Sequence, residues 1–119
     1  MAEHNELGKK GEQLAVDFLL NNSYEIVARN YRFNKAEVDI IAKKDDILAI
    51  IEVKTRSTSD FGDPQDFVKP KQIQHLVKAV DDYVIANELE LEVRFDIIAI
   101  VKEGKGYAIE HLENAFYHF

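Results

Sequence analysis

The chain of 119 residues contains no cysteine and no apolar run long enough to cross a bilayer. Without cysteine it can form no disulfide framework, no thiolate metal site and no cysteine nucleophile. A transmembrane helix needs roughly 20 consecutive apolar residues, so no membrane span and no membrane partner are expected. The opening stretch MAEHNELGKKGEQ lacks the apolar core of a signal peptide. The simplest expectation is a cytoplasmic protein.

The formal net charge is −7, which taken alone argues against a nucleic-acid partner. The acidity is concentrated near the end of the chain. Residues 81–119 hold 3 basic and 9 acidic side chains, whereas residues 1–80 hold 12 and 13. The basic side chains of residues 1–80 fit equally well a phosphate-facing surface or an ordinary solvated surface of mixed charge. Five of them are candidates for nucleic-acid contacts: Lys9, Arg29, Arg32, Arg56 and Lys71.

Hydrophobic periodicity predicts two helices and five strands in a single domain covering residues 1–119. Apolar residues recur at helical spacing in residues 5–22 and again from Pro70 to about Asn87. Residues 57–69 are rich in Ser, Asp, Gly and Pro, which predicts a long loop. The expected strands are 24–31, 36–43, 47–55, 93–101 and 107–111.

This order of elements predicts an α/β fold, with a mixed central sheet flanked by helices. Strands 36–43 and 47–55 are joined by a tight connection and are expected to form a hairpin. A right-handed crossover through the second helix would make strands 47–55 and 93–101 parallel. The latter strand is almost continuously apolar, so we expect it to be buried on both faces.

Ionisable residues lie inside two of the most apolar predicted strands. Glu37 and Asp39 interrupt the stretch AEVDIIA, and Glu52 and Lys54 follow the apolar run 47–51 directly. Buried charges are costly unless they are paired or hold a metal. Because alternate residues of a strand share a face, one hairpin register brings Asp39 beside Glu52 and Lys54.

Two neighbouring carboxylates repel each other, and a divalent cation removes that conflict. Hard oxygen ligands in a chain without cysteine suit Mg²⁺ or Mn²⁺. Such an ion can lower the pKa of a bound water and orient a phosphodiester. Lys54 could stabilise the charge that develops on the phosphate. Glu12, at the edge of the first helix's apolar stripe, and Gln72, near the start of the second helix, could reach the same site.

Asp39, followed after 12 residues by Glu52-Val53-Lys54, matches the acid…acid-x-Lys signature of the PD-(D/E)xK nucleases. Longer stretches are more specific: GKKGEQLAVDFLLNNSYEIVARNYR, AEVDIIA, IIEVKTRS, FGDP and RFDIIAI together resemble the YraN family of small bacterial proteins. The resemblance runs from about residue 8 to residue 116. That family is similar to archaeal Holliday-junction resolvases, which implies a restriction-endonuclease-like fold with the element order α-β-β-β-α-β-β.

Carried over residue by residue, the resemblance implies roles for the acids and the lysine. Asp39, Glu52 and the carbonyl of Val53 would hold Mg²⁺ or Mn²⁺, and Glu12 would bind a second metal or its water shell. Lys54 would position the nucleophile or neutralise charge. The implied catalytic set is Glu12, Asp39, Glu52, Lys54 and Gln72.

The alignment to the family pattern is ambiguous at one position, and the sequence departs from the pattern at another. The helix glutamine of resolvase-type members corresponds to Gln72 or, in a shifted alignment, to Gln74. In the pattern GE-(I/V)-D, which includes Glu37, this chain has Ala36 in place of the usual glycine. An alanine is tolerated in a strand, although it makes a close backbone approach at this point less favourable.

Several residues also have ordinary structural interpretations. Glu52 and Lys54 could be an ion pair on an exposed edge strand, where such pairs contribute little. Asp96 is better interpreted as a structural partner of Arg94 or of a loop backbone than as a ligand. The four histidines show no metal-ligand spacing and are expected at the surface: His4, His75, His111 and His118.

The sequence therefore predicts a metal-dependent endonuclease that hydrolyses phosphodiester bonds in DNA, with branched or junction DNA as one substrate class. DNA is favoured over RNA. One alternative is a nucleic-acid-binding module that keeps the fold without turnover. Another is an adaptor that uses the acidic residues 81–119 as a protein interface. Because symmetric cutting of a junction needs two active sites, a resolvase-like role predicts a twofold homodimer.

Overall fold

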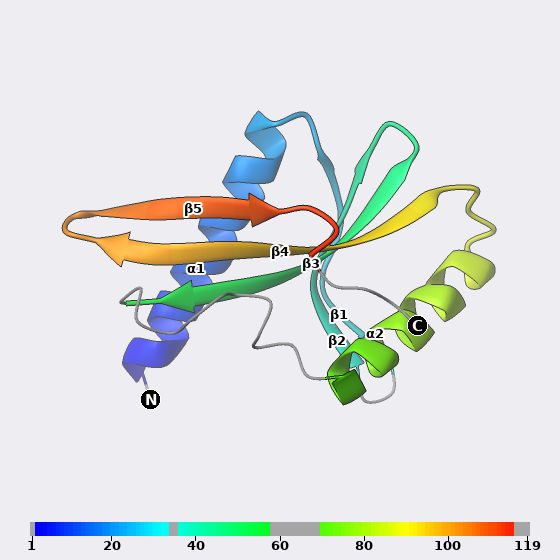
Figure 1. Cartoon of the computed structure of the whole chain (residues 1–119), viewed down its shortest axis with the longest axis horizontal. Coiled ribbons are helices and arrows are strands. Elements are labelled where there is room, and N and C mark those ends of the chain that lie inside the picture. The colour runs from blue at the N-terminus through cyan, green and yellow to red at the C-terminus, as the bar shows by residue number, and fades with distance from the viewer. Residues whose placement is uncertain (1, 34–35, 58–69, 116–119) are drawn as a thin grey trace.

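The computed structural model describes residues 2–33, 36–57 and 70–115, of which the side chains at 2–5, 33, 36 and 70–73 are outside the description. It contains one five-stranded sheet in the order β1-β2-β3-β4-β5, with two helices (Figure 1). The elements are α1 (Ala2–Asn21), β1 (Glu25–Phe33), β2 (Ala36–Lys44), β3 (Ile47–Arg56), α2 (Pro70–Ala86), β4 (Glu92–Glu103) and β5 (Gly106–Leu112).

The predicted fold class and element order are confirmed, and the observed boundaries differ from the predicted ones by a few residues. β2 and β3 form the expected antiparallel hairpin, and β3 and β4 are parallel on either side of the α2 crossover. The pairs β1–β2 and β4–β5 are antiparallel, which makes the sheet mixed. No helix among the described residues is long and apolar enough to cross a membrane.

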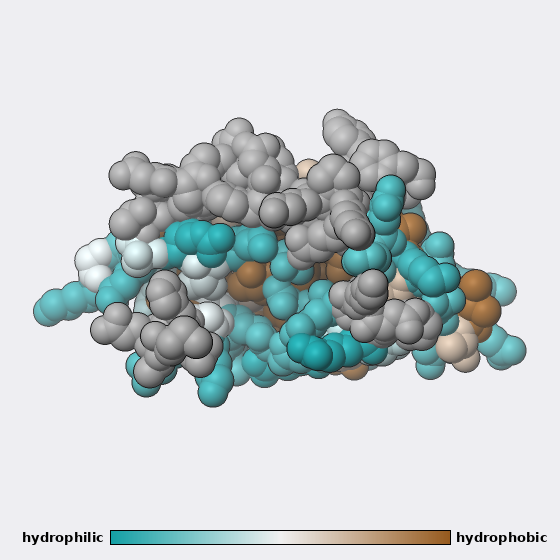
Figure 2. Space-filling model, turned by 90° about the horizontal axis from the view of Figure 1, so that it is seen from below, coloured by the Kyte–Doolittle hydropathy of each residue, from teal (hydrophilic) through white to brown (hydrophobic). Residues whose placement is uncertain are grey.

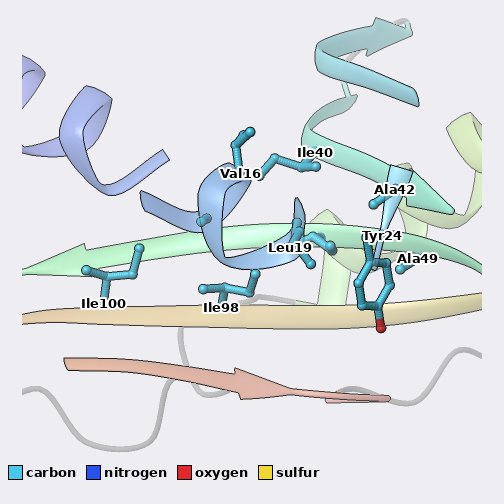
Figure 3. Close-up of a cluster of buried hydrophobic side chains, with 10 residues drawn as sticks. Val16, Leu19, Tyr24, Ile40, Ala42, Ala49, Ile98 and Ile100 are labelled. Atoms are coloured by element: carbon cyan, nitrogen blue, oxygen red, sulfur yellow. The ribbon is translucent and has the colours of Figure 1, made fainter. Parts of the chain in front are cut away.

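The two helices cover opposite faces of the sheet, so two hydrophobic clusters form. On one face, Val16 and Leu19 of α1 pack in one cluster with Ile40, Ile98 and Ile100 (Figure 3). The other cluster joins Leu76 and Val80 of α2 to Ile50, Phe95 and Ile97. β4 supplies residues to both clusters, which confirms the prediction that this strand is buried on both faces.

The sheet forks between β2 and β3. Their ladder runs from Lys44–Ile47 at the hairpin end to Ile40–Ile51 and stops there. Beyond that pair, β2 continues with β1 and β3 continues with β4 as far as Arg56–Val101. Figure 1 shows the result: β3 runs alongside β4 and β5 while the lower parts of β1 and β2 turn away from it. At the fork, the β3 residues that follow Ile51 face the β2 residues that precede Ile40 without being paired to them as strands.

Gly11 lets α1 approach β3 closely beside this fork. A Cβ built at Gly11 would meet the side chain of Thr55, reaching its Cγ2 at 2.8 Å and its Cβ at 2.9 Å. Real Cβ atoms do not approach other atoms this closely, so any larger residue must push the helix away. A Cβ built at Gly8, one turn earlier, meets no described atom within 4 Å apart from its chain neighbours and the backbone of its own helix.

We predict that Gly11→Ala and Gly8→Ala change stability in opposite directions. Gly11→Ala overpacks the contact with Thr55 and should destabilise the protein by about 1–3 kcal/mol. Gly8→Ala should stabilise it by about 0.5–1 kcal/mol, because alanine loses less backbone entropy in an open helix position. Urea unfolding of both variants measures the difference. Equal stability of the two variants would contradict the close contact between α1 and β3.

Candidate functional site

A pocket of about 410 Å³ opens at the fork, and we call it the fork pocket. It brings together residues from α1, β1, β2 and β3. These residues lie between Leu7 and Arg56 in the sequence, which are 49 positions apart. Three carboxylates and two basic groups are among them. The lining residues are Leu7, Gly8, Glu12, Asn30, Glu37, Asp39, Val53, Lys54, Thr55 and Arg56.

Asp39 closes the fork with its side chain. The backbone N–H of Val53 donates a hydrogen bond to Asp39 Oδ2 at 2.8 Å. Val53 lies two residues beyond Ile51, the last β3 residue paired with β2, so the carboxylate takes the place of a strand carbonyl. This interaction explains why an acid occupies an otherwise apolar strand.

The environment of Asp39 disfavours its charged form. Burial raises the pKa of the Asp39 carboxyl above its ordinary value. The hydrogen bond from Val53 acts in the opposite direction, as does the positive charge of Lys54, while Glu12 and Glu37 raise the pKa further. A carboxylate held under such conditions gains from a nearby cation, whether a metal ion or a protonated side chain.

Glu12 projects from α1 toward β1, where Arg29 and Asn30 hold it. Its Oε1 accepts hydrogen bonds from Arg29 Nε at 3.2 Å, Arg29 Nη2 at 3.1 Å and Asn30 Nδ2 at 3.2 Å. Asn30 has a positive φ of 52°, which interrupts the alternation of β1 and lets two consecutive side chains reach the same carboxylate. Glu12 thus lines the fork pocket with a fixed orientation.

Asn30 lines the fork pocket, although the sequence patterns did not indicate it as a site residue. Its signal in the sequence is weak: an asparagine within an otherwise strand-like stretch, ARNYR. Asparagine is one of the few non-glycine residues that tolerate the left-handed conformation. That tolerance could have indicated an irregular strand, but not which side chain the irregularity would bring within reach.

Glu52 and Lys54 form an ion pair, with 3.4 Å between Lys54 Nζ and Glu52 Oε1. The two side chains are only 11% and 18% exposed, and β3 is the central strand of the sheet. The alternative of a solvated ion pair on an edge strand is therefore wrong. Lys54 lines the fork pocket and lowers the pKa of Asp39, whereas Glu52, itself a described residue, is not among the lining residues.

The candidate nucleic-acid contacts differ in their availability. Arg29 bonds to Glu12 and Gln13, and Arg32 pairs with Glu37 at 3.0 Å. Arg56 lines the fork pocket and donates a hydrogen bond to the Thr55 carbonyl. Lys9 is exposed on α1. The last contact candidate, Lys71, and the predicted catalytic residue Gln72 belong to the first turn of α2, and their side chains lie outside the described residues.

A second charged cluster lies on the α1 face of β4. Asp96 is fully buried and accepts hydrogen bonds from Arg94, from the Asn114 backbone N–H at 3.0 Å and from His111 Nε2 at 2.8 Å. Burial alone would raise the pKa of Asp96, but the hydrogen bonds from His111, Arg94 and Asn114 outweigh it and lower the pKa. These contacts confirm Asp96 as a structural partner of Arg94 and of the backbone.

The expectation that all four histidines lie at the surface is wrong for His111. Its side chain is only 10% exposed, and its ring packs edge-on against Phe18 and Tyr24. Because Asp96 is an isolated acid within the apolar stretch RFDIIAI, the sequence indicates that it needs partners but not that a histidine from β5 is one of them. The cluster fixes the end of β5 to β4, away from the fork pocket.

We predict that Asp39→Asn stabilises the metal-free protein at neutral pH. The raised pKa means that the folded protein binds the Asp39 proton more tightly than the unfolded chain does. Stability therefore falls as pH rises from the ordinary value of 3.8 through the raised value. The amide that replaces the carboxyl in this variant can still accept the Val53 hydrogen bond through its oxygen but carries no charge.

This prediction is tested by measuring the free energy of unfolding in EDTA between pH 4 and pH 7. That interval of about three pH units covers the ordinary pKa of a carboxyl group and raised values above it. The advantage of the Asp39→Asn variant should grow as pH increases, while the control Asp81→Asn, on an exposed position of α2, should show no such growth. A variant that is less stable than the wild type throughout would mean that the ionised carboxylate is stabilised by its neighbours.

The fold and the fork pocket define a small mixed α/β protein with an acidic pocket between two diverging strands. Residues 11–100 match the family described as "Uncharacterised protein family UPF0102", and the chain belongs to that family. UPF0102 proteins from Flavobacterium psychrophilum and Christiangramia forsetii are 65% and 66% identical to it over the full length of both chains. A relative from Bacteroides fragilis is 48% identical, with 98% of this chain and 97% of the relative aligned. The predicted YraN-like family is thus confirmed.

Proposed function

We propose that this protein is a metal-dependent endonuclease that hydrolyses phosphodiester bonds in DNA, including branched or junction DNA. The observation that carries the proposal is the position of Asp39. It lies at a fork in the sheet, next to Val53 and Lys54, with a carboxyl whose charged form is disfavoured by burial. The same three residues belong to the spacing that resembles the PD-(D/E)xK nucleases, so a relationship to that superfamily is part of the proposal.

The donor atoms at the fork suit a hard cation. The described residues that line the pocket offer carboxylate and carbonyl oxygens but no sulfur or imidazole. In the described ranges, no three acidic or imidazole side chains converge closely enough to form a metal cage by themselves. Mg²⁺ is typically bound through only one or two carboxylates, with water and substrate phosphate completing its shell. Asp39 and the Val53 carbonyl, from the pocket lining, together with Glu52, which lies outside that lining, would hold Mg²⁺ or Mn²⁺. The ion would activate a water molecule and neutralise phosphate charge.

The remaining pocket residues act on the substrate and on the water. Lys54 is close enough to Asp39 to lower its pKa, so its ammonium is also placed to counter charge developing on a phosphate beside Asp39. Arg56 lines the same pocket and can contact an adjacent phosphate. Glu12, held by Arg29 and Asn30, presents a carboxylate of fixed orientation that can accept a hydrogen bond from the attacking water.

A nucleic-acid-binding module without turnover is the second candidate, and the ion pairs favour it. Glu12 pairs with Arg29 and Glu52 pairs with Lys54, so two of the three proposed metal-binding acids are neutralised by the protein itself. In an active enzyme, metal and substrate would have to compete with these contacts. The two candidates therefore differ in whether Mg²⁺ or Mn²⁺ binding changes the fork pocket.

The adaptor hypothesis gains less support. The acidic segment 81–119 includes β4 and β5, which contribute to the core. One of its acids, Asp96, is buried and hydrogen-bonded within the protein, so it is not available to a partner. Among the coloured atoms in Figure 2, hydrophobic residues lie in separate areas between hydrophilic ones. A cytoplasmic location and a twofold homodimer stay predictions that go with the nuclease proposal.

The decisive test is cleavage of labelled branched, flapped, single-stranded and duplex DNA with Mg²⁺ or Mn²⁺. Asp39→Ala, Glu52→Ala and Lys54→Met should each lower the rate by about 100-fold or more, as expected when a group that acts in the transition state is removed. Glu110→Gln, an exposed position on β5, serves as the control and should leave the rate unchanged.

Two results would count against the nuclease proposal. Cleavage that persists in the Asp39→Ala and Glu52→Ala proteins would indicate a contaminating nuclease. Absence of cleavage by the pure wild-type protein, together with DNA binding that weakens with salt, would favour the binding module.

A further inference from the structure

A second pocket, of about 510 Å³, adjoins the fork pocket, and we call it the hairpin pocket. The two pockets share Leu7, and Ser57 of the hairpin pocket directly follows Arg56 of the fork pocket. Its volume falls within the roughly 300–1,000 Å³ typical of small-ligand sites. The lining residues are Glu6, Leu7, Lys10, Ser57, Lys102 and Tyr107.

Three elements meet at this pocket: the first turns of α1, the end of β3 and the β4–β5 hairpin. Figure 1 shows all three at the same end of the molecule, on the left of the view. Lys102 and Tyr107 are directly paired across the hairpin, so their side chains are neighbours on one face. Tyr107 also packs against the hydrophobic cluster beneath α1, which restrains its ring while leaving part of it accessible.

The cations of the hairpin pocket differ from those around the fork pocket. Lys10 and Lys102 are both exposed, and neither forms an ion pair with an acid in the part of the chain that the structure describes. By contrast, Arg29, Arg32 and Lys54 are all paired with carboxylates.

The charge balance of the two pockets is also opposite. Among the residues that the structure describes, the hairpin pocket is lined by two lysines and one acid, Glu6, whereas the fork pocket is lined by three acids and two basic residues. A negatively charged chain that enters the fork pocket would therefore meet lysines without an ion-pair partner among the described residues, Lys10 and Lys102, in the adjoining hairpin pocket.

We propose that the hairpin pocket binds one unpaired nucleotide of a DNA strand that continues out of the fork pocket. Its phosphate lies between Lys10 and Lys102, and its base stacks on Tyr107. The inference rests on the proposed nuclease function and narrows its substrate. A base can stack on a protein ring only when it is free of its duplex neighbours, so the preferred DNA has a single-stranded segment beside the cleaved bond, as in a flap or a branch.

The lysine contacts are tested by fluorescence anisotropy with a labelled single-stranded oligonucleotide in EDTA, which prevents cleavage. Lys10→Ala and Lys102→Ala should each reduce the slope of log K against log[salt] by about 0.7, the value for one phosphate on a single strand. At 0.1 M salt that loss corresponds to about five-fold weaker binding. The matched control is Lys105→Ala, in the turn between β4 and β5, which is exposed but does not line the pocket.

The stacking contact is tested with Tyr107→Phe and Tyr107→Leu. Leucine fills much of the core-facing space but has no aromatic face, so binding should weaken about five-fold or more, whereas phenylalanine should bind like the wild type. Thermal unfolding of both variants separates loss of stacking from loss of structure. The leucine variant should also lose its preference for cutting flaps over duplex DNA.

Each outcome decides between the two proposals. If wild-type protein cuts flaps but the Lys10, Lys102 and Tyr107 variants behave like Lys105→Ala, the hairpin subsite is wrong and the nuclease stands. If wild-type protein binds single strands without ever cutting, and the variants lose binding as predicted, the subsite stands as part of a binding module. If wild-type protein neither binds nor cuts, both proposals fail.

Discussion

Beyond the Ile40–Ile51 pair, β2 and β3 share no further ladder hydrogen bonds, and the Val53 N–H bonds to the Asp39 carboxylate instead. A backbone N–H left without a partner at this depth would be costly, and a carboxylate left without one would cost more. The interaction satisfies the first group and only part of the second, since burial still raises the Asp39 pKa. The fork is thus stable as a fold element while retaining an acid that favours additional positive charge.

The other groups reach the fork because α1 lies close to β3. Gly11 permits that approach at Thr55, and the next residue, Glu12, is thereby directed toward Arg29 and Asn30 of β1. The same placement of α1 brings its first turns to the β4–β5 hairpin, where Lys10 and Lys102 line the hairpin pocket. One helix therefore contributes to both pockets, and the proposed DNA strand would pass from one to the other along it.

Much of the fold followed from the sequence because burial imposes periodicity. The hairpin of β2 and β3, the parallel pairing of β3 with β4 and the two-sided burial of β4 were all predictable from apolar spacing and connection rules. The acids within strands were visible as violations of that spacing. The contacts of each acid could not be predicted in this way. The partners of Glu12 reach it because the backbone is irregular at Asn30, and one partner of Asp96 is a histidine 15 residues away. Side-chain partners at long sequence separation leave no periodic signal.

In the proposed function, the fork pocket holds a divalent cation through Asp39. A crystal structure of the protein soaked in Mn²⁺, with anomalous diffraction recorded, tests it most directly. We expect an anomalous peak at the fork, with Asp39, the Val53 carbonyl and Glu52 as protein ligands and with the Glu52–Lys54 ion pair loosened. A fork pocket without Mn²⁺, in which Asp39 still accepts only the Val53 hydrogen bond and Glu52 stays with Lys54, would contradict it.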